Sequence, residues 1–219
     1  ERWLKSYPDD KRKAFCFDGL CYNGEIYNDG KNAHQGNEEK LWNNTDRRIL
    51  FLMKDTNNNS DSDYREWHWR NINHNFFNCI FKWLEGLSRI SKDFIPTMEN
   101  GDYATVPNAV VTKYPLAIVN IKKISGTSFV SNKTLYEYAN RDKAFLQEQI
   151  RGILHPNIIV CGGGKGTVLN IAKNIIYEDE SFREINYFCH YSRKLNILLI
   201  DSFHPSARIN SYWKIEDMM

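Results

Sequence analysis

Four short apolar segments, each long enough for one buried strand, alternate with longer segments in which apolar residues recur at helical spacing. The apolar segments are residues 48–53, 115–120, 158–161 and 197–200. The helical pattern covers residues 64–90, 133–153 and 167–176. Strands that alternate with helices are typical of a parallel sheet that is covered on both faces. We therefore predict an α/β fold with three layers, α/β/α, around a mostly parallel central sheet of four strands.

The length of 219 residues fits a single domain, residues 1–219, because a second hydrophobic core needs a longer chain. Within it, the polar and turn-rich residues 1–47 are predicted to be an N-terminal elaboration, and residues 48–213 the core. The elaboration is expected to contain a hairpin of residues 20–22 with 25–27 and a short helix over 38–42. We also expect residues 187–191 to pair with the fourth strand, and residues 91–107 to be irregular.

The formal net charge is +2 and the isoelectric point is about 8.2, far from a strongly basic nucleic-acid-binding protein. Any DNA binding must therefore come from a local patch. No apolar run approaches the roughly 20 residues of a membrane span, and no targeting segment is visible, so we expect a cytoplasmic protein (nucleoid-associated if bacterial) or a nuclear one. The candidates for a DNA-facing patch are Lys122, Lys123, Lys165, Arg193, Lys194 and Arg208.

Five cysteines occur at irregular spacing, and none forms a Cys-x-x-Cys pair. This pattern indicates neither a zinc site nor an iron–sulfur cluster. We expect reduced cysteines, most of them buried, in a cytosolic protein without a metal or an organic cofactor.

Polar side chains follow three of the four predicted strands: Asp55 after the first, Asn120 at the end of the second, and His204 after the fourth. Ligands of open α/β sheets bind outside the carboxyl ends of the strands, so these three residues form a candidate site. An imidazole can stabilise a developing anion or carry a proton, a carboxylate can orient water, and an amide can read a base edge. Structural roles remain the alternative, since Asp is common in turns and an amide can satisfy nearby backbone.

The turn Cys-Gly-Gly-Gly-Lys-Gly-Thr at residues 161–167 resembles a phosphate-binding loop, but Gly166 stands where the Walker pattern requires Ser or Thr. We interpret these glycines as a tight connection from a strand to a helix, whose amino end can still contact a phosphate. Trp67, beyond the loop that follows Asp55, is interpreted either as a core residue or as a side chain that stacks on a ligand ring.

Taken in chain order, these motifs resemble the uracil-DNA glycosylase superfamily over roughly residues 48–213. Asp55 lies in Lys-Asp-Thr-Asn, where the family has the residue that positions the hydrolytic water. Asn120 ends Ala-Ile-Val-Asn, similar to the strand whose Asn reads the base, and His204 begins His-Pro-Ser-Ala-Arg, similar to the family's last motif. The first motif lacks the family's Gly, Pro and the Tyr that excludes thymine, so the resemblance does not imply uracil as the substrate.

The resemblance implies a DNA glycosylase-like hydrolase that flips a damaged or modified base and cleaves its N-glycosidic bond without a cofactor. We expect a monomer, although the sequence does not determine the oligomeric state. It assigns the sugar cation and the water to Asp55, the departing base anion to His204, and the base edge to Asn120. It also assigns stacking on the base to Trp67, contact with phosphate to Ser206, and filling of the space that the flipped base leaves in the DNA to Arg208. Two alternatives remain: a catalytically weak module that binds DNA or a protein partner, and an enzyme acting on a free nucleotide or nucleoside.

Overall fold

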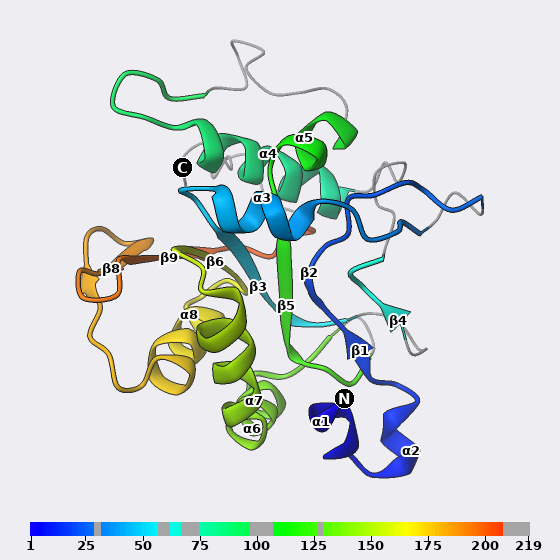
Figure 1. The fold of residues 1–219 in the computed structure, drawn as a ribbon. Helices are drawn as coiled ribbons and strands as arrows, with labels where there is room; N and C mark the ends of the chain where they lie inside the picture. Colours follow the sequence, from blue (N-terminus) through cyan, green and yellow to red (C-terminus); the bar gives the residue numbers. More distant parts are fainter. Residues whose placement is uncertain (29–31, 57–61, 67–74, 97–106, 127–128, 208–219) are drawn as a thin grey trace.

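The computed structural model describes residues 1–28, 32–56, 62–66, 75–96, 107–126 and 129–207. In this part of the chain, a seven-stranded mixed sheet lies between two layers of helices (Figure 1). The α/β class is as predicted, but the sheet is neither four-stranded nor mostly parallel. Its spatial order is β2 (Gly19–Leu20), β5 (Ala117–Lys122), β3 (Ile49–Asp55), β6 (Ile158–Gly162), β9 (Ile197–Ser202), β8 (Cys189–Ser192) and β7 (Arg183–Glu184).

The four predicted strands form the centre of this sheet, where the adjacent pairs β5–β3, β3–β6 and β6–β9 are all parallel. The three additional strands, β2, β8 and β7, are antiparallel and lie at the two sides. They have only two to four residues, too few for a recognisable apolar run, so the sequence pattern indicated only the pairing of β8 with β9. A separate small sheet joins β1 (Cys16–Phe17) to β4 (Ser62–Asp63).

Alternate residues of the central strands divide the core between the two faces of the sheet. Leu50 and Leu52 of β3 pack with α6 (Asn132–Arg141), α7 (Lys143–Gln147), the π-helix η2 (Glu148–Leu154), α8 (Thr167–Ile171) and the π-helix η3 (Ala172–Ile176). Ile49, Phe51 and Met53 pack on the other face with α4 (Asn75–Arg89) and α5 (Pro107–Lys113). Because the faces alternate strictly, each polar residue near a strand end can be assigned to one face.

Several predicted elements differ from the structure. Residues 133–153 are helical as predicted, but they are divided into α6, α7 and η2. The helix α6 ends at Arg141 and is followed by Asp142, whose buried carboxylate accepts a hydrogen bond from the Tyr7 hydroxyl. Residues 62–66 form β4 and a turn, so the helix predicted from residue 64 was wrong there, and α5 lies partly in the stretch expected to be irregular.

The N-terminal segment contributes α1 (Arg2–Lys5), α2 (Asp9–Arg12), β1, β2 and α3 (Glu38–Asn44). The hairpin predicted there was wrong, because Leu20 pairs with β5 and Ile26 forms a bridge with Ala33. The predicted helix over 38–42 is confirmed as α3, and the Trp42 indole donates a 2.8 Å hydrogen bond to the Leu154 carbonyl oxygen. Across the described ranges, no helix combines the length and apolar character needed to cross a membrane.

Candidate active site

Asp55 is the last residue of β3 and lies in register with Lys122 at the end of β5. The Asp55 carboxylate oxygen Oδ2 lies 3.1 Å from the Lys122 ammonium, which also donates a 2.5 Å hydrogen bond to the Ile124 carbonyl oxygen. The two charged side chains are only 11% and 9% exposed, so solvent screens this ion pair weakly. Lys122 therefore holds the candidate catalytic carboxylate in place and is not the surface cation that its position in the sequence indicated.

His204 follows β9 in a short loop, and its environment favours the neutral imidazole. Burial lowers its pKa below the usual value of 6.5; the positive charge of Lys54 lowers it further, and the negative charge of Asp55 opposes both. Nδ1 of His204 accepts a 3.2 Å hydrogen bond from the backbone N–H of Ser206. A neutral imidazole that accepts at Nδ1 carries its proton on Nε2, so His204 is a hydrogen-bond donor at neutral pH.

Asn120 lies inside β5, two residues before its end, and not at the strand terminus that the sequence indicated. Its backbone N–H donates a 2.8 Å hydrogen bond to Oδ2 of Asp18, and its side-chain amide donates a 3.2 Å hydrogen bond to the same oxygen. The residue is 4% exposed. The structural alternative for Asn120 is thus partly realised, since the amide nitrogen has a partner within the protein.

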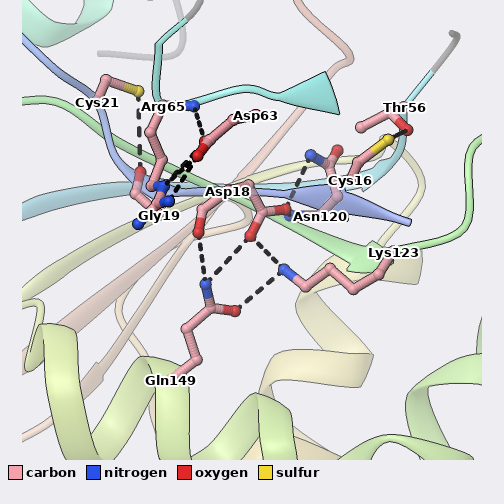
Figure 2. A network of polar contacts seen from close by, with 10 residues as sticks. All are labelled: Cys16, Asp18, Gly19, Cys21, Thr56, Asp63, Arg65, Asn120, Lys123 and Gln149. Carbon is pink, nitrogen blue, oxygen red and sulfur yellow. Dashed lines mark hydrogen bonds and ion pairs between the residues drawn. The ribbon is translucent and has the colours of Figure 1, made fainter. Parts of the chain in front are cut away.

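Asp18 belongs to a buried polar network that the sequence did not indicate (Figure 2). Its Oδ1 pairs with the Lys123 ammonium and accepts a 3.1 Å hydrogen bond from the Gln149 amide, whose oxygen accepts a 3.0 Å hydrogen bond from Lys123. Burial lowers the pKa of Lys123, and the charge of Asp18 opposes that shift. Asp18 lies in the polar, turn-rich N-terminal segment before Gly19, where an Asp-Gly pair is typical of a turn, and no local sequence signal indicates its burial.

Register and alternation bring the candidate residues to the same edge and the same face of the sheet. Met53 is in register with both Asn120 and Gly162, and Gly162 with Ser202, so the carboxyl ends of β5, β3, β6 and β9 lie together. Asp55 and Asn120 fall on the face that α4 covers, and the His204 ring lies 5.4 Å from the ring of Phe76 in α4. An acid, an amide and an imidazole that are remote in the sequence therefore share one region of the molecule.

The other predicted contacts are only partly described. Trp67 and Arg208 lie outside the described residues. Ser206, predicted to hold a phosphate, is exposed, and its backbone N–H supports the His204 ring. Of the predicted basic patch, Lys122 and Lys123 are buried in ion pairs and Lys194 pairs with Glu180, whereas Lys165 and Arg193 are exposed.

The glycine-rich turn after β6 is a structural connection, as predicted. Gly164, Lys165 and Gly166 have positive φ angles of 66°, 53° and 71°, and glycine adopts that conformation without steric cost. The N–H groups of Gly163 and Gly164 both donate to the Ser202 carbonyl oxygen, and that of Gly166 donates to Asp201. These donors anchor the turn to β9, immediately before the His204 loop, and are not directed to an external phosphate.

No model of a known protein family matches the chain, and no curated protein sequence is significantly similar to it. All five cysteines are free thiols. Among the described residues, no group of three or more His, Cys, Asp or Glu side chains is arranged to hold a metal ion. The geometry of the candidate site is therefore the basis for any functional assignment.

Proposed function

We propose that the protein is a DNA glycosylase-like hydrolase, related in mechanism to the uracil-DNA glycosylase superfamily, that cleaves the N-glycosidic bond of a flipped base. The observation that carries this proposal is that a carboxylate, Asp55 at the end of β3, and an imidazole, His204 after β9, lie at the same edge of the sheet. Nδ1 of His204 accepts a hydrogen bond from Ser206, which places the proton of the neutral ring on Nε2. The four central parallel strands, with helices on both faces, agree with the fold that the resemblance implies.

The two groups complement the charges that develop when a glycosidic bond breaks. The sugar becomes cationic, and a carboxylate at the end of β3 stabilises that charge and orients the attacking water. The base becomes anionic, and the Nε2–H of His204 donates a hydrogen bond to it; such a preorganised donor contributes several kcal/mol in a dry site. Because this donor is neutral, the base leaves the sugar as an anion that the hydrogen bond stabilises, and the base is not protonated before the bond breaks.

A specific observation favours a second candidate, a catalytically weak module of the same fold that binds DNA or a protein partner. The Lys122 ammonium 3.1 Å from Asp55 partly cancels the negative charge that the sugar cation needs. A carboxylate that is paired with an ammonium stabilises the sugar cation less than a free carboxylate does.

The deciding experiment is mass spectrometry of bases freed from oligonucleotides that carry uracil, hypoxanthine, thymine mismatches or hypermodified pyrimidines. Release of one of these bases, lost in the Asp55→Asn variant, supports the hydrolase. Tight binding of the same oligonucleotides without release of any base supports the binding module. Hydrolysis of free nucleosides with no affinity for DNA contradicts both.

A further inference from the structure

A carboxylate that accepts two hydrogen bonds from one asparagine fixes the orientation of that side chain. Oδ2 of Asp18 accepts from both the backbone N–H and the side-chain amide of Asn120, at 2.8 and 3.2 Å (Figure 2). The Asp18 side chain is 1% exposed, and its other oxygen is occupied by Lys123 and Gln149. The carboxylate is thus held from the opposite side and cannot rotate away.

The chemistry of the two groups allows only one amide orientation. A carboxylate paired with an ammonium accepts hydrogen bonds and donates none, so the amide must turn its NH₂ group toward Asp18. The flipped amide would place its carbonyl oxygen against the carboxylate oxygen, with two acceptors in contact and no proton between them. Such an unsatisfied buried contact costs about 1–3 kcal/mol for each group.

The fixed amide presents one acceptor and one remaining donor. Among the described residues, Oδ1 of Asn120 accepts no hydrogen bond, and Nδ2 has one N–H left after its bond to Asp18. Uracil, thymine, hypoxanthine and guanine have a ring N–H beside a carbonyl oxygen on their pairing edge, whereas cytosine and adenine have a ring nitrogen acceptor beside an amino group. The two classes require opposite amide orientations in the same pose.

We propose that Asp18 is a specificity-determining residue that fixes the Asn120 amide and restricts the site to bases with a ring N–H beside a carbonyl group. This inference rests on the proposed glycosylase function. A neutral His204 suits bases of this class (oxo bases), because they leave as delocalised anions. An amino base such as adenine needs a proton donor instead. Asp18 acts through Asn120, so it is a positioning residue and does not contact the substrate.

The test compares the double variant Asp18→Ala with Lys123→Met against the wild-type protein. The first change removes the acceptor that fixes the Asn120 amide, whereas an asparagine at this position would still turn its oxygen toward the Asn120 backbone N–H and hold the amide as before. The second change removes the ammonium that would otherwise remain buried without its counter-charge. The control is Gln149→Met, which removes a partner of Oδ1 and leaves both bonds to Asn120 in place. Circular dichroism and thermal unfolding establish that each variant is folded.

Two readouts are measured: base release from single-stranded oligonucleotides carrying uracil, hypoxanthine, cytosine or adenine, and binding of the free bases uracil and cytosine by ligand-observed NMR. The wild-type protein and the control are expected to prefer bases with a ring N–H beside a carbonyl group. In the double variant, the ratio of uracil to cytosine, in release rate and in affinity, is expected to fall by about 30-fold or more, because the two hydrogen bonds of the Asn120 amide no longer favour uracil. An unchanged ratio, an equal loss in the control, or a wild-type preference for cytosine would overturn the role of Asp18.

Failure of the proposed function gives a different result. A wild-type protein that releases no base is not a glycosylase, but the NMR comparison still decides whether Asp18 sets the preference of Asn120 for uracil over cytosine. A protein that releases oxo bases, but whose double variant retains full discrimination, is a glycosylase in which the specificity arises elsewhere.

Discussion

The charge of Asp55 is the most direct test of the proposed chemistry, and its removal in Asp55→Asn has an effect that can be estimated. Two unit charges about 4 Å apart interact by roughly 4 kcal/mol at an effective dielectric constant of about 20. Such a loss in the transition state slows the reaction by about 1000-fold. The Lys122 ammonium at 3.1 Å already cancels part of this interaction, so we expect a decrease of about 100- to 1000-fold in base release.

The same substitution leaves the Lys122 ammonium without its counter-charge in a site where both side chains are nearly buried. Breaking a buried ion pair from one side costs about 3–5 kcal/mol in stability. The Asn amide oxygen and the Ile124 carbonyl still accept hydrogen bonds from Lys122, so this range is an upper bound. A second variant, Asp55→Asn with Lys122→Met, removes both charges and separates loss of chemistry from loss of the fold.

The assay is single-turnover release from a labelled oligonucleotide that contains the accepted base, with alkaline cleavage of the resulting abasic site. Asp93→Asn, an exposed acid beyond the end of α4, serves as the control for a change of net charge. Circular dichroism establishes that the variants are folded. Base release at the wild-type rate in either Asp55 variant would falsify the role of this carboxylate in catalysis.

Three further predictions concern the imidazole, the DNA contact and the core. Because burial and Lys54 lower the pKa of His204, its neutral form persists below pH 6.5. Protonation of Nδ1 breaks the hydrogen bond from Ser206 that positions the ring, so the acid limb of base release should lie below pH 6.5 and disappear in His204→Gln, and a limb above 6.5 contradicts the assignment. Lys165→Ala, at the carboxyl edge of the sheet, should reduce the salt slope of DNA binding by about one, while Lys113→Ala at the opposite edge leaves it unchanged; equal slopes argue against DNA contact there. Ile80→Ala in the fully buried face of α4 should lower the free energy of unfolding by about 2–5 kcal/mol in urea denaturation, and a loss below 1 kcal/mol means that the α4 layer packs loosely.

The sequence predicted the parts of the fold in which burial leaves a periodic pattern. The four central strands are apolar on both faces, and α4 has a broad apolar face, so their positions could be read from hydrophobic residues alone. Strands β2 and β7 have two residues each and carry no such pattern; their pairing depends on contacts across the sheet. For the same reason, the end of β5 was misplaced, since Lys122 is a charged residue that continues a buried strand.

The candidate site was predictable to the extent that its residues lie at the end of a buried strand, as Asp55 does, or just after one, as His204 does. The partners of those residues were not predictable, because they are charges whose burial arises only from the tertiary structure. Lys122 and Lys123 have the appearance of surface lysines in the sequence, and Asp18 has that of a turn residue. The ion pairs that hold these charges join residues 67 and 105 positions apart, a relation without a local signal.

The pairing of β2 with β5 has a consequence for the design of shortened proteins. Gly19 and Leu20 pair with one side of β5, whose six residues are all buried. The Asp18 carboxylate accepts a hydrogen bond from the backbone N–H of Asn120, further along the same strand. A fragment that begins at residue 48 would bare this row of backbone donors and acceptors to neighbouring molecules, and an uncovered apolar strand of that kind promotes aggregation. Residues 16–21 therefore act as a protective border for the sheet, and a shortened protein has to retain them.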